Sequence, residues 1–209
     1  NRQFQWFHEP SFLYPCVPAQ AASLLQACGH EVQWCAAHAE GKDWPQFLRL
    51  LLRFKPEMVS IETKGPVVRQ HWAIIGEIKT ILPDCVCVLM GDHVSGNPKE
   101  TMMESRTDFA FEGGDWDFML QNLVEHLTHQ TPLKSGVWYR NEAGEIESTG
   151  PYKAYGDLNE LPFIDRHLTN AHLYFEKWKK RLPFVWTMAG RDCPYGRCTF
   201  CSWTVTYPN

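Results

Sequence analysis

The apolar positions between residues 15 and 130 follow two alternating periods. Helical periodicity predicts helices at about 18–28, 44–55, 68–82, 97–105 and 116–128. Gly29 is placed to end the first helix in a left-handed conformation, and Pro56 stops the second. Asp43 and Gln46 have the spacing of a capping box, and Asp115 is placed to cap the last of these helices.

Short apolar stretches lie between these helices. They predict strands at 31–37, 57–63, 85–90 and 108–112, with a first strand lost or degraded within 4–14. Strands that alternate with helices of this length are typical of βαβ units, so the chain is predicted to be α/β with an N-terminal doubly wound parallel sheet. Ligands of such sheets bind beyond the carboxyl ends of the strands, which here carry the sequences IETKGP, MGDHVSG and FEGGD.

The pattern changes from residue 135 onward. SGVWYRNEAGEIEST alternates around Glu142 to Gly144, which predicts a β-hairpin. Residues 150–167 show neither period and contain two prolines, so they are predicted to form an interdomain linker. A helix is predicted at 170–181. An apolar strand at 182–190 then leads into a loop with three cysteines.

Composition narrows the class of protein. The chain has 209 residues, 44% hydrophobic and 13% aromatic, which is enough for a packed core. A formal net charge of −4 with dispersed basic residues gives no reason to expect a nucleic-acid surface. No stretch approaches the ~20 apolar residues of a membrane span, no signal peptide is evident, and both ends look like cuts through a longer chain. Cys16, Cys28, Cys35, Cys85 and Cys87 are scattered through apolar segments, which suits free thiols in a cytoplasmic protein.

The other three cysteines are candidate metal ligands. Cys193, Cys198 and Cys201 have the spacing C-x4-C-x2-C, and thiolates this close in sequence can converge on one metal centre. A structural zinc needs four ligands, whereas a cubane iron–sulfur cluster with three cysteines leaves one iron open. Three core cysteines close together by coincidence, or a zinc site, remain alternatives, although Arg191 and Arg197 make this loop polar.

The loop sequence GRDCPYGRCTFCSW resembles the cluster loop of the radical S-adenosylmethionine (SAM) superfamily. The resemblance implies a 4Fe–4S cluster on Cys193, Cys198 and Cys201, with SAM on the open iron and Phe200 against the adenine. In that family, reductive cleavage of SAM gives a 5′-deoxyadenosyl radical. The common spacing is C-x3-C-x2-C, so this loop has one extra residue, which Gly196 could accommodate with a positive φ.

The upstream half is similar to the cobalamin-binding class of that superfamily. The similarity rests on a doubly wound domain, the linker phrase DLNELPFIDRH and a strand that enters the cysteine loop. It implies a cobalamin-binding-like Rossmann domain at 1–134, a hairpin and linker at 135–169, and the start of a radical SAM partial βα barrel at 170–209. Cobalamin would then contact the strand-end loops through Glu62, Thr63, Gly91, Asp92, His93, Glu112, Gly113 and Gly114.

Some of these strand-end residues have other readings. His93 is interpreted as a polar contact to the corrin or its tail rather than a cobalt ligand, and a surface-loop histidine is an equal alternative. Gly91, Gly113 and Gly114 suit close approach of a bulky cofactor, although turn formation alone would also explain them. Glu62 and Lys64 form either a solvated pair or part of the same crevice.

The resemblance implies the N-terminal fragment of a cobalamin-dependent radical SAM enzyme. The commonest chemistry of the class is methyl transfer to an unactivated centre, on small-molecule, lipid or natural-product substrates, with a reducing partner such as flavodoxin or ferredoxin. The fragment alone would be inactive. Two alternatives remain, namely a radical SAM enzyme without functional cobalamin, and a non-catalytic corrinoid- or zinc-binding module.

Overall fold

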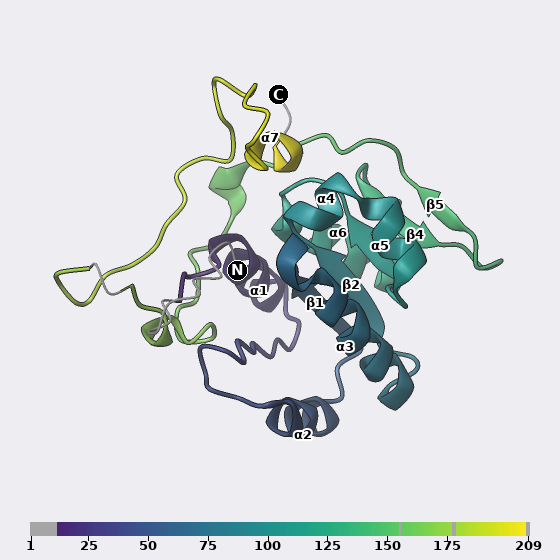
Figure 1. Cartoon of the computed structure of the whole chain (residues 1–209), viewed down its shortest axis with the longest axis horizontal. Helices are drawn as coiled ribbons and strands as arrows, with labels where there is room; N and C mark the ends of the chain where they lie inside the picture. The colour runs from purple at the N-terminus through teal and green to yellow at the C-terminus, as the bar shows by residue number, and fades with distance from the viewer. Residues whose placement is uncertain (1–11, 155, 177–178, 208–209) are drawn as a thin grey trace. The chain divides into compact units, whose positions relative to one another are not determined.

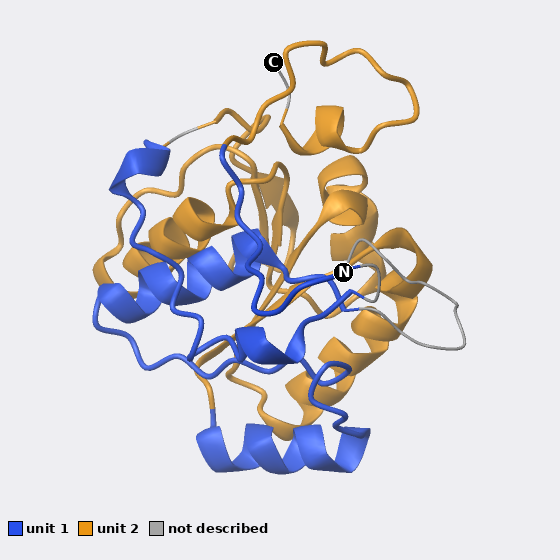
Figure 2. Ribbon diagram, turned by 90° about the vertical axis from the view of Figure 1, so that its left-hand side faces the viewer, with its two compact units in different colours: residues 1–55, 157–189 blue, residues 56–156, 190–209 orange. Residues whose placement is uncertain are grey.

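The computed structural model describes residues 12–154, 156–176 and 179–207. The chain divides into two compact units, coloured separately in Figure 2. Unit 1 comprises residues 1–55 and 157–189, and unit 2 comprises residues 56–156 and 190–209. Most of the degraded strand predicted within 4–14 lies outside the described residues, and residues 12–14 are not in a strand.

Among its described residues, unit 1 contains two α-helices, α1 (Cys16–Ala27) and α2 (Trp44–Phe54), shown in Figure 1. Gly29, just after α1, has a φ of +92°, which confirms its predicted left-handed conformation. The predicted capping box of α2 is also confirmed, because Asp43 Oδ1 accepts from the Gln46 backbone N at 2.8 Å while Gln46 Oε1 accepts from the Asp43 backbone N at 2.8 Å.

The capping box predicts a local stability effect. Asp43→Ala should lower the free energy of unfolding of unit 1 by about 1 kcal/mol, because the Gln46 amide loses its acceptor at the start of α2. Asp43→Asn keeps an acceptor and should cost much less. Urea unfolding followed by far-UV circular dichroism measures both variants, and equal losses would contradict the capping role.

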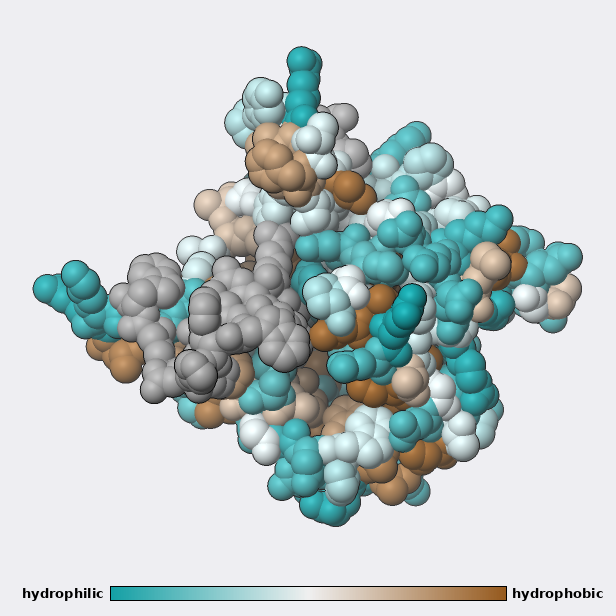
Figure 3. Space-filling view, in the orientation of Figure 1, coloured by the Kyte–Doolittle hydropathy of each residue, from teal (hydrophilic) through white to brown (hydrophobic). Residues whose placement is uncertain are grey.

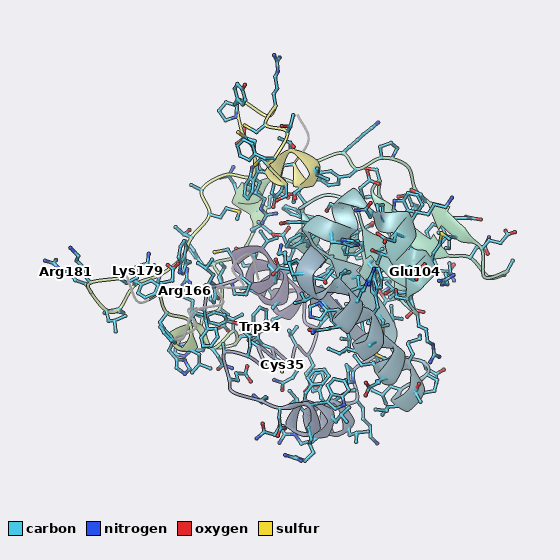
Figure 4. All side chains as sticks on the ribbon, in the orientation of Figure 1. Trp34, Cys35, Glu104, Arg166, Lys179 and Arg181 are labelled. Atoms are coloured by element: carbon cyan, nitrogen blue, oxygen red, sulfur yellow. The ribbon has the colours of Figure 1, made fainter. Side chains whose placement is uncertain are left out.

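The core of unit 1 is aromatic and gathers segments from both ends of its sequence. Tyr14, Ala19, Ala36 and Tyr174 are buried together, with Trp186 partly buried against them. The Asp165 backbone N donates to Ser23 Oγ of α1 at 2.8 Å, so the predicted linker is tied to this helix. Figure 4 labels Arg166 and Lys179, whose cations lie 5.3 Å from the Tyr14 ring and 4.4 Å from the Trp186 ring, respectively.

Unit 2 contains a five-stranded sheet in the order β1-β2-β3-β4-β5. Its strands are β1 (Met58–Glu62), β2 (Val86–Met90), β3 (Phe109–Phe111), β4 (Val137–Arg140) and β5 (Ile146–Ser148). The first three strands pair in parallel, and β4 and β5 form the predicted hairpin, which joins the sheet because β4 pairs antiparallel with β3.

The helices of unit 2 are α3 (Val68–Ile81), α4 (Asp92–Gly96), α5 (Pro98–Glu104), α6 (Trp116–His129) and α7 (Trp203–Thr206), with the 3-10 turn η1 (Gly65–Val67) before α3. Three of them, α3, α5 and α6, follow the strands as the sequence predicts, whereas α4 and α7 were not predicted. Helices α3, α4 and α5 cover one face of the sheet and α6 covers the other (Figures 1 and 2). The α/β fold with a doubly wound sheet is therefore confirmed.

The interior of unit 2 is apolar because β2 is covered on both faces. Val88 and Leu89 are fully buried, as are Ile75 of α3 and Met119 of α6. Cys85 and Cys87 belong to this core, since their exposed fractions are 3% and 0%. The hydrogen bond with Cys85, together with burial, raises the pKa of the Cys87 thiol.

No helix in the described part of the chain is long and apolar enough to cross a membrane.

Three predicted elements of the chain are wrong. Residues 31–37 and 182–190 form no strand, and the helix predicted at 170–181 is only the 3-10 turn η3 (Ala171–Leu173), with residues 177–178 outside the description. Both absent strands lack a neighbouring strand among the described residues, and a lone strand cannot satisfy its backbone donors and acceptors. The other 3-10 turn, η2 (Leu158–Glu160), interrupts the linker.

Candidate functional site

The carboxyl ends of β1, β2 and β3 meet at one edge of the sheet because these strands are parallel. Glu62 is the last residue of β1, and the other strand-end residues predicted from the sequence directly follow the strands, namely Thr63, Gly91, Asp92, His93, Glu112, Gly113 and Gly114. After β2 the chain does not form the predicted strand-end loop but the short helix α4. The structure therefore gathers the predicted strand-end residues at one edge.

Lys64 is the centre of an ion-pair network at this edge. Its ammonium lies 2.9 Å from Glu62 Oε1 and 3.1 Å from Asp92 Oδ1. The Lys64 side chain is only 8% exposed, so the solvated-pair alternative is wrong and the pair lines the edge. Trp116 places its ring 5.6 Å from the same ammonium. The network fixes the carboxylate of Asp92 relative to the end of β1.

Two buried polar atoms at the edge have no hydrogen-bond partner among the described residues, namely Thr63 Oγ1 and His93 Nε2. His93 lies in α4 and its side chain is 16% exposed, so the surface-loop alternative is wrong. Its Nε2 is 3.3 Å from Glu100 Oε2 but outside hydrogen-bond geometry. Such a buried group left unpaired typically costs about 1–3 kcal/mol, which favours a partner for it in the assembled protein.

The three predicted glycines make room for other parts of the same chain. A Cβ at Gly91 would lie 2.1 Å from the Thr63 carbonyl oxygen, and one at Gly113 would lie 2.3 Å from the Tyr152 ring. A Cβ at Gly114 would lie 2.4 Å from Thr206 Cγ2. The close approach expected for a cofactor is thus made by the Thr63 backbone, by Tyr152 and by the segment around α7.

Glu112 has a structural role at the same edge. Its Oε2 accepts from Trp138 Nε1 at 3.1 Å, and its Oε1 lies 3.5 Å from the Tyr152 backbone N. The carboxylate therefore ties the end of β3 to the hairpin and to the segment beyond it.

The cysteine loop, residues 193–201, begins and ends beside this edge within unit 2. Cys193, Cys198 and Cys201 are half-buried and form no disulfide, and the Cys201 backbone N donates to the Cys198 carbonyl at 3.2 Å. Within the described residues, no group of three His, Cys, Asp or Glu side chains is gathered closely enough to hold a metal ion. The shared metal centre therefore stays a prediction.

The tip of the loop is open to solvent. Gly196 has a φ of +55°, which confirms the positive φ predicted for the extra residue of the loop. Tyr195 and Phe200 are 66% and 89% exposed, and Figure 3 shows apolar side chains at the surface of this segment, at the top of the view. The contact predicted between Phe200 and an adenine needs such an exposed ring and remains a prediction.

The residues that connect the loop to the sheet are not among those predicted from the sequence. Asp115 does not cap α6 as predicted, because its carboxylate is turned to Tyr152 and Arg191 instead. Burial lowers the pKa of Arg191, but its hydrogen bond with Asp117 and the charge of that carboxylate raise it by more, so the guanidinium stays charged. The sequence did contain one sign of this attachment, because Arg191 stands two residues before Cys193, the first cysteine of a polar loop.

No protein-family model matches the chain, and no curated protein matches it. Several solved structures do. The structure of the radical S-adenosylmethionine methyltransferase TsrM from Kitasatospora setae, with cobalamin and a 4Fe–4S cluster bound, matches with a TM-score of 0.57 and 18% identity. That match covers 76% of this chain and 29% of that one.

A second protein gives a similar result. The structure of the cobalamin-dependent S-adenosylmethionine radical enzyme OxsB, with aqua-cobalamin and S-adenosylmethionine bound, matches with a TM-score of 0.58 and 15% identity, over 68% of this chain and 20% of that one. The resemblance predicted from the sequence is therefore confirmed at the level of the fold. The chain spans less than a third of either protein.

Proposed function

We propose that this chain is part of a cobalamin-dependent radical SAM enzyme, with a cobalamin-binding-like domain at 1–134, a hairpin and linker at 135–169 and the start of the radical SAM domain at 170–209. The observation that carries the proposal is the attachment of the cysteine loop to the carboxyl edge of a Rossmann-like sheet. It is supported by the fold shared with TsrM and OxsB, whose structures contain cobalamin together with a 4Fe–4S cluster or SAM.

The chemistry of the cysteine loop fits a cluster. Cys193, Cys198 and Cys201 are thiols outside any disulfide, on a loop whose positive-φ Gly196 lets the backbone turn between the first two. Three thiolates from one loop suit an iron–sulfur cluster with an open iron better than a closed zinc site, which needs four protein ligands. In the proposal these three cysteines hold the cluster, and Phe200 covers the adenine of SAM.

The strand-end loops fit cobalamin through their unpaired polar atoms. The Thr63 hydroxyl and the His93 ring nitrogen lack partners among the described residues, and each has the chemistry to donate to or accept from an amide group of a corrin. Asp92, held by Lys64, orients the start of α4 on which His93 lies. When bound, the cluster would supply the electron that cleaves SAM, and cobalamin would carry the methyl group. We therefore propose methyl transfer to an unactivated centre.

One observation favours a second function, a radical SAM enzyme without functional cobalamin. The side chains of Tyr152 and Thr206 already occupy the space beside Gly113 and Gly114, where close approach of a corrin was expected. In that case the strand-end loops would dock a substrate, and the cysteine loop would keep its role.

Anaerobic reconstitution of the full-length protein tests these proposals. The expected result is an iron–sulfur chromophore, cobalamin retained after removal of free cofactor, and release of 5′-deoxyadenosine from SAM under reduction. A cluster without retained cobalamin would favour the second function. A colourless protein that holds zinc would overturn both and leave the non-catalytic zinc-binding module, while cobalamin retained without a cluster would leave a corrinoid-binding module.

A further inference from the structure

Arg191 is held at the start of α6 by two buried carboxylates. Its two terminal guanidinium nitrogens donate to both oxygens of Asp117, with Nη1 and Oδ1 2.8 Å apart, and Nη1 also donates to Asp115 Oδ1 at 3.1 Å. The side chains of Arg191, Asp115 and Asp117 are 9%, 8% and 0% exposed. We infer that Arg191 is a positioning residue, whose ion pairs hold the start of the cysteine loop at the carboxyl edge of the sheet.

The geometry of this cluster fixes orientation as well as distance. A planar guanidinium that meets a carboxylate with two parallel hydrogen bonds allows little rotation, which an ammonium on the same site would allow. The remaining acceptors are used, since Asp117 Oδ1 also accepts from the Phe118 backbone N at 2.9 Å and Asp115 Oδ2 accepts from the Tyr152 hydroxyl at 2.6 Å. No other partner is needed to satisfy the two carboxylates.

Because the cluster is buried, it contributes more to the position of the cysteine loop than to the free energy of unfolding. Removing charges from water is costly, so a buried ion pair adds little net stability even when its geometry is good. Removing one partner of the pair is nevertheless costly, because the other partner is then left as an unpaired buried charge. The cluster therefore penalises any arrangement in which Arg191 leaves Asp117, and the cysteine loop starts two residues later.

The far end of the loop is attached separately. Ser202 Oγ, one residue after Cys201, donates to Asp92 Oδ2 at 3.1 Å, and the Tyr207 hydroxyl donates to the Gly114 carbonyl at 3.0 Å. Thr206 and Tyr207 are 0% and 7% exposed. Both ends of the loop are thus fixed to the same sheet edge, and Tyr195 and Phe200 between them stay exposed.

The inference rests on the proposed function only for what the loop binds, and the attachment itself can be measured without a cofactor. Hydrogen exchange of the full-length protein without a cluster should show faster exchange in residues 192–201 for Arg191→Met, by about tenfold or more, with the second half of α6 unchanged. Arg191→Lys should be intermediate. Arg197→Met is the matched control, because Arg197 is exposed on the same loop and no ion pair to it is described.

A second readout follows the cluster. After anaerobic reconstitution with SAM, Arg191→Met should change the electron paramagnetic resonance signal of the reduced cluster, Arg191→Lys should restore part of it, and Arg197→Met should leave it as in the wild type. If Arg191→Met does not fold, Asp115→Ala removes one acceptor of the Arg191 guanidinium and should raise exchange in the same residues.

Three outcomes separate the two proposals. Unchanged exchange in Arg191→Met, or equal changes in Arg191→Met and Arg197→Met, would overturn the positioning role. A wild-type protein that binds no cluster would overturn the proposed function and leave the exchange result to decide on Arg191. A bound cluster whose signal is the same in all variants would overturn the positioning role alone.

Discussion

Replacing Cys198 with alanine should abolish the iron–sulfur chromophore of the reconstituted full-length protein. Three thiolates are the whole protein ligand set in the proposal, so loss of one leaves two irons of the cubane without a protein ligand. The variant should also release 5′-deoxyadenosine from SAM only at the level seen without enzyme. Iron and sulfide content and the visible spectrum, measured after anaerobic reconstitution, give the result.

A cysteine outside the loop provides the control for this prediction. Cys28 is exposed and forms no disulfide, so Cys28→Ala should keep the chromophore and the release of 5′-deoxyadenosine. Two results would argue against the ligand role of Cys198, namely a full chromophore in Cys198→Ala, or its loss in both variants. Unfolding of the two proteins without cluster should be alike, because Cys198 lies on a half-exposed loop.

Helices α1, α2, α3, α5 and α6 could be predicted from the sequence because their signals are local, whereas the helix predicted at 170–181 is wrong. Gly29, Pro56 and the Asp43–Gln46 capping box lie within a few residues of the helix ends that they define. The strands at 31–37 and 182–190 were predicted from apolar runs in the same way and are wrong. A strand depends on pairing with residues far along the chain, and an apolar run carries no information on whether that partner is present.

The same distinction separates the predicted from the missed parts of the site. The strand-end residues could be located because parallel topology alone brings them to one edge. The pairing of Arg191 with Asp117 joins residues 74 positions apart, and the contact of Ser202 with Asp92 spans 110. No motif marks these contacts, since each residue is ordinary for its own segment. Asp115 even looks like a helix cap, and only the structure shows that its carboxylate is turned to Tyr152 and Arg191.

Gly91→Ala should be among the most destabilising single substitutions of unit 2. The φ of +128° and ψ of 178° at Gly91 are values that only glycine adopts readily, at a cost of about 1–3 kcal/mol for another residue. The added Cβ would also lie 2.1 Å from the Thr63 carbonyl oxygen, and overpacking of this kind costs about 1–3 kcal/mol more. We expect the free energy of unfolding to fall by about 2–6 kcal/mol in urea.

The control for this substitution lies at the other end of α4. A Cβ at Gly96 would have Val205 Cγ1 as its nearest neighbour at 4.0 Å, and its φ is not positive, so Gly96→Ala should change stability by about 1 kcal/mol at most. Equal effects of the two substitutions would contradict the packing argument. Because Asp92 and His93 follow Gly91 directly, the displaced backbone should also disturb the ion pair with Lys64. In the absence of urea, where the variant is still folded, Gly91→Ala should therefore retain less cobalamin than the wild type. Gly96→Ala should retain as much as the wild type.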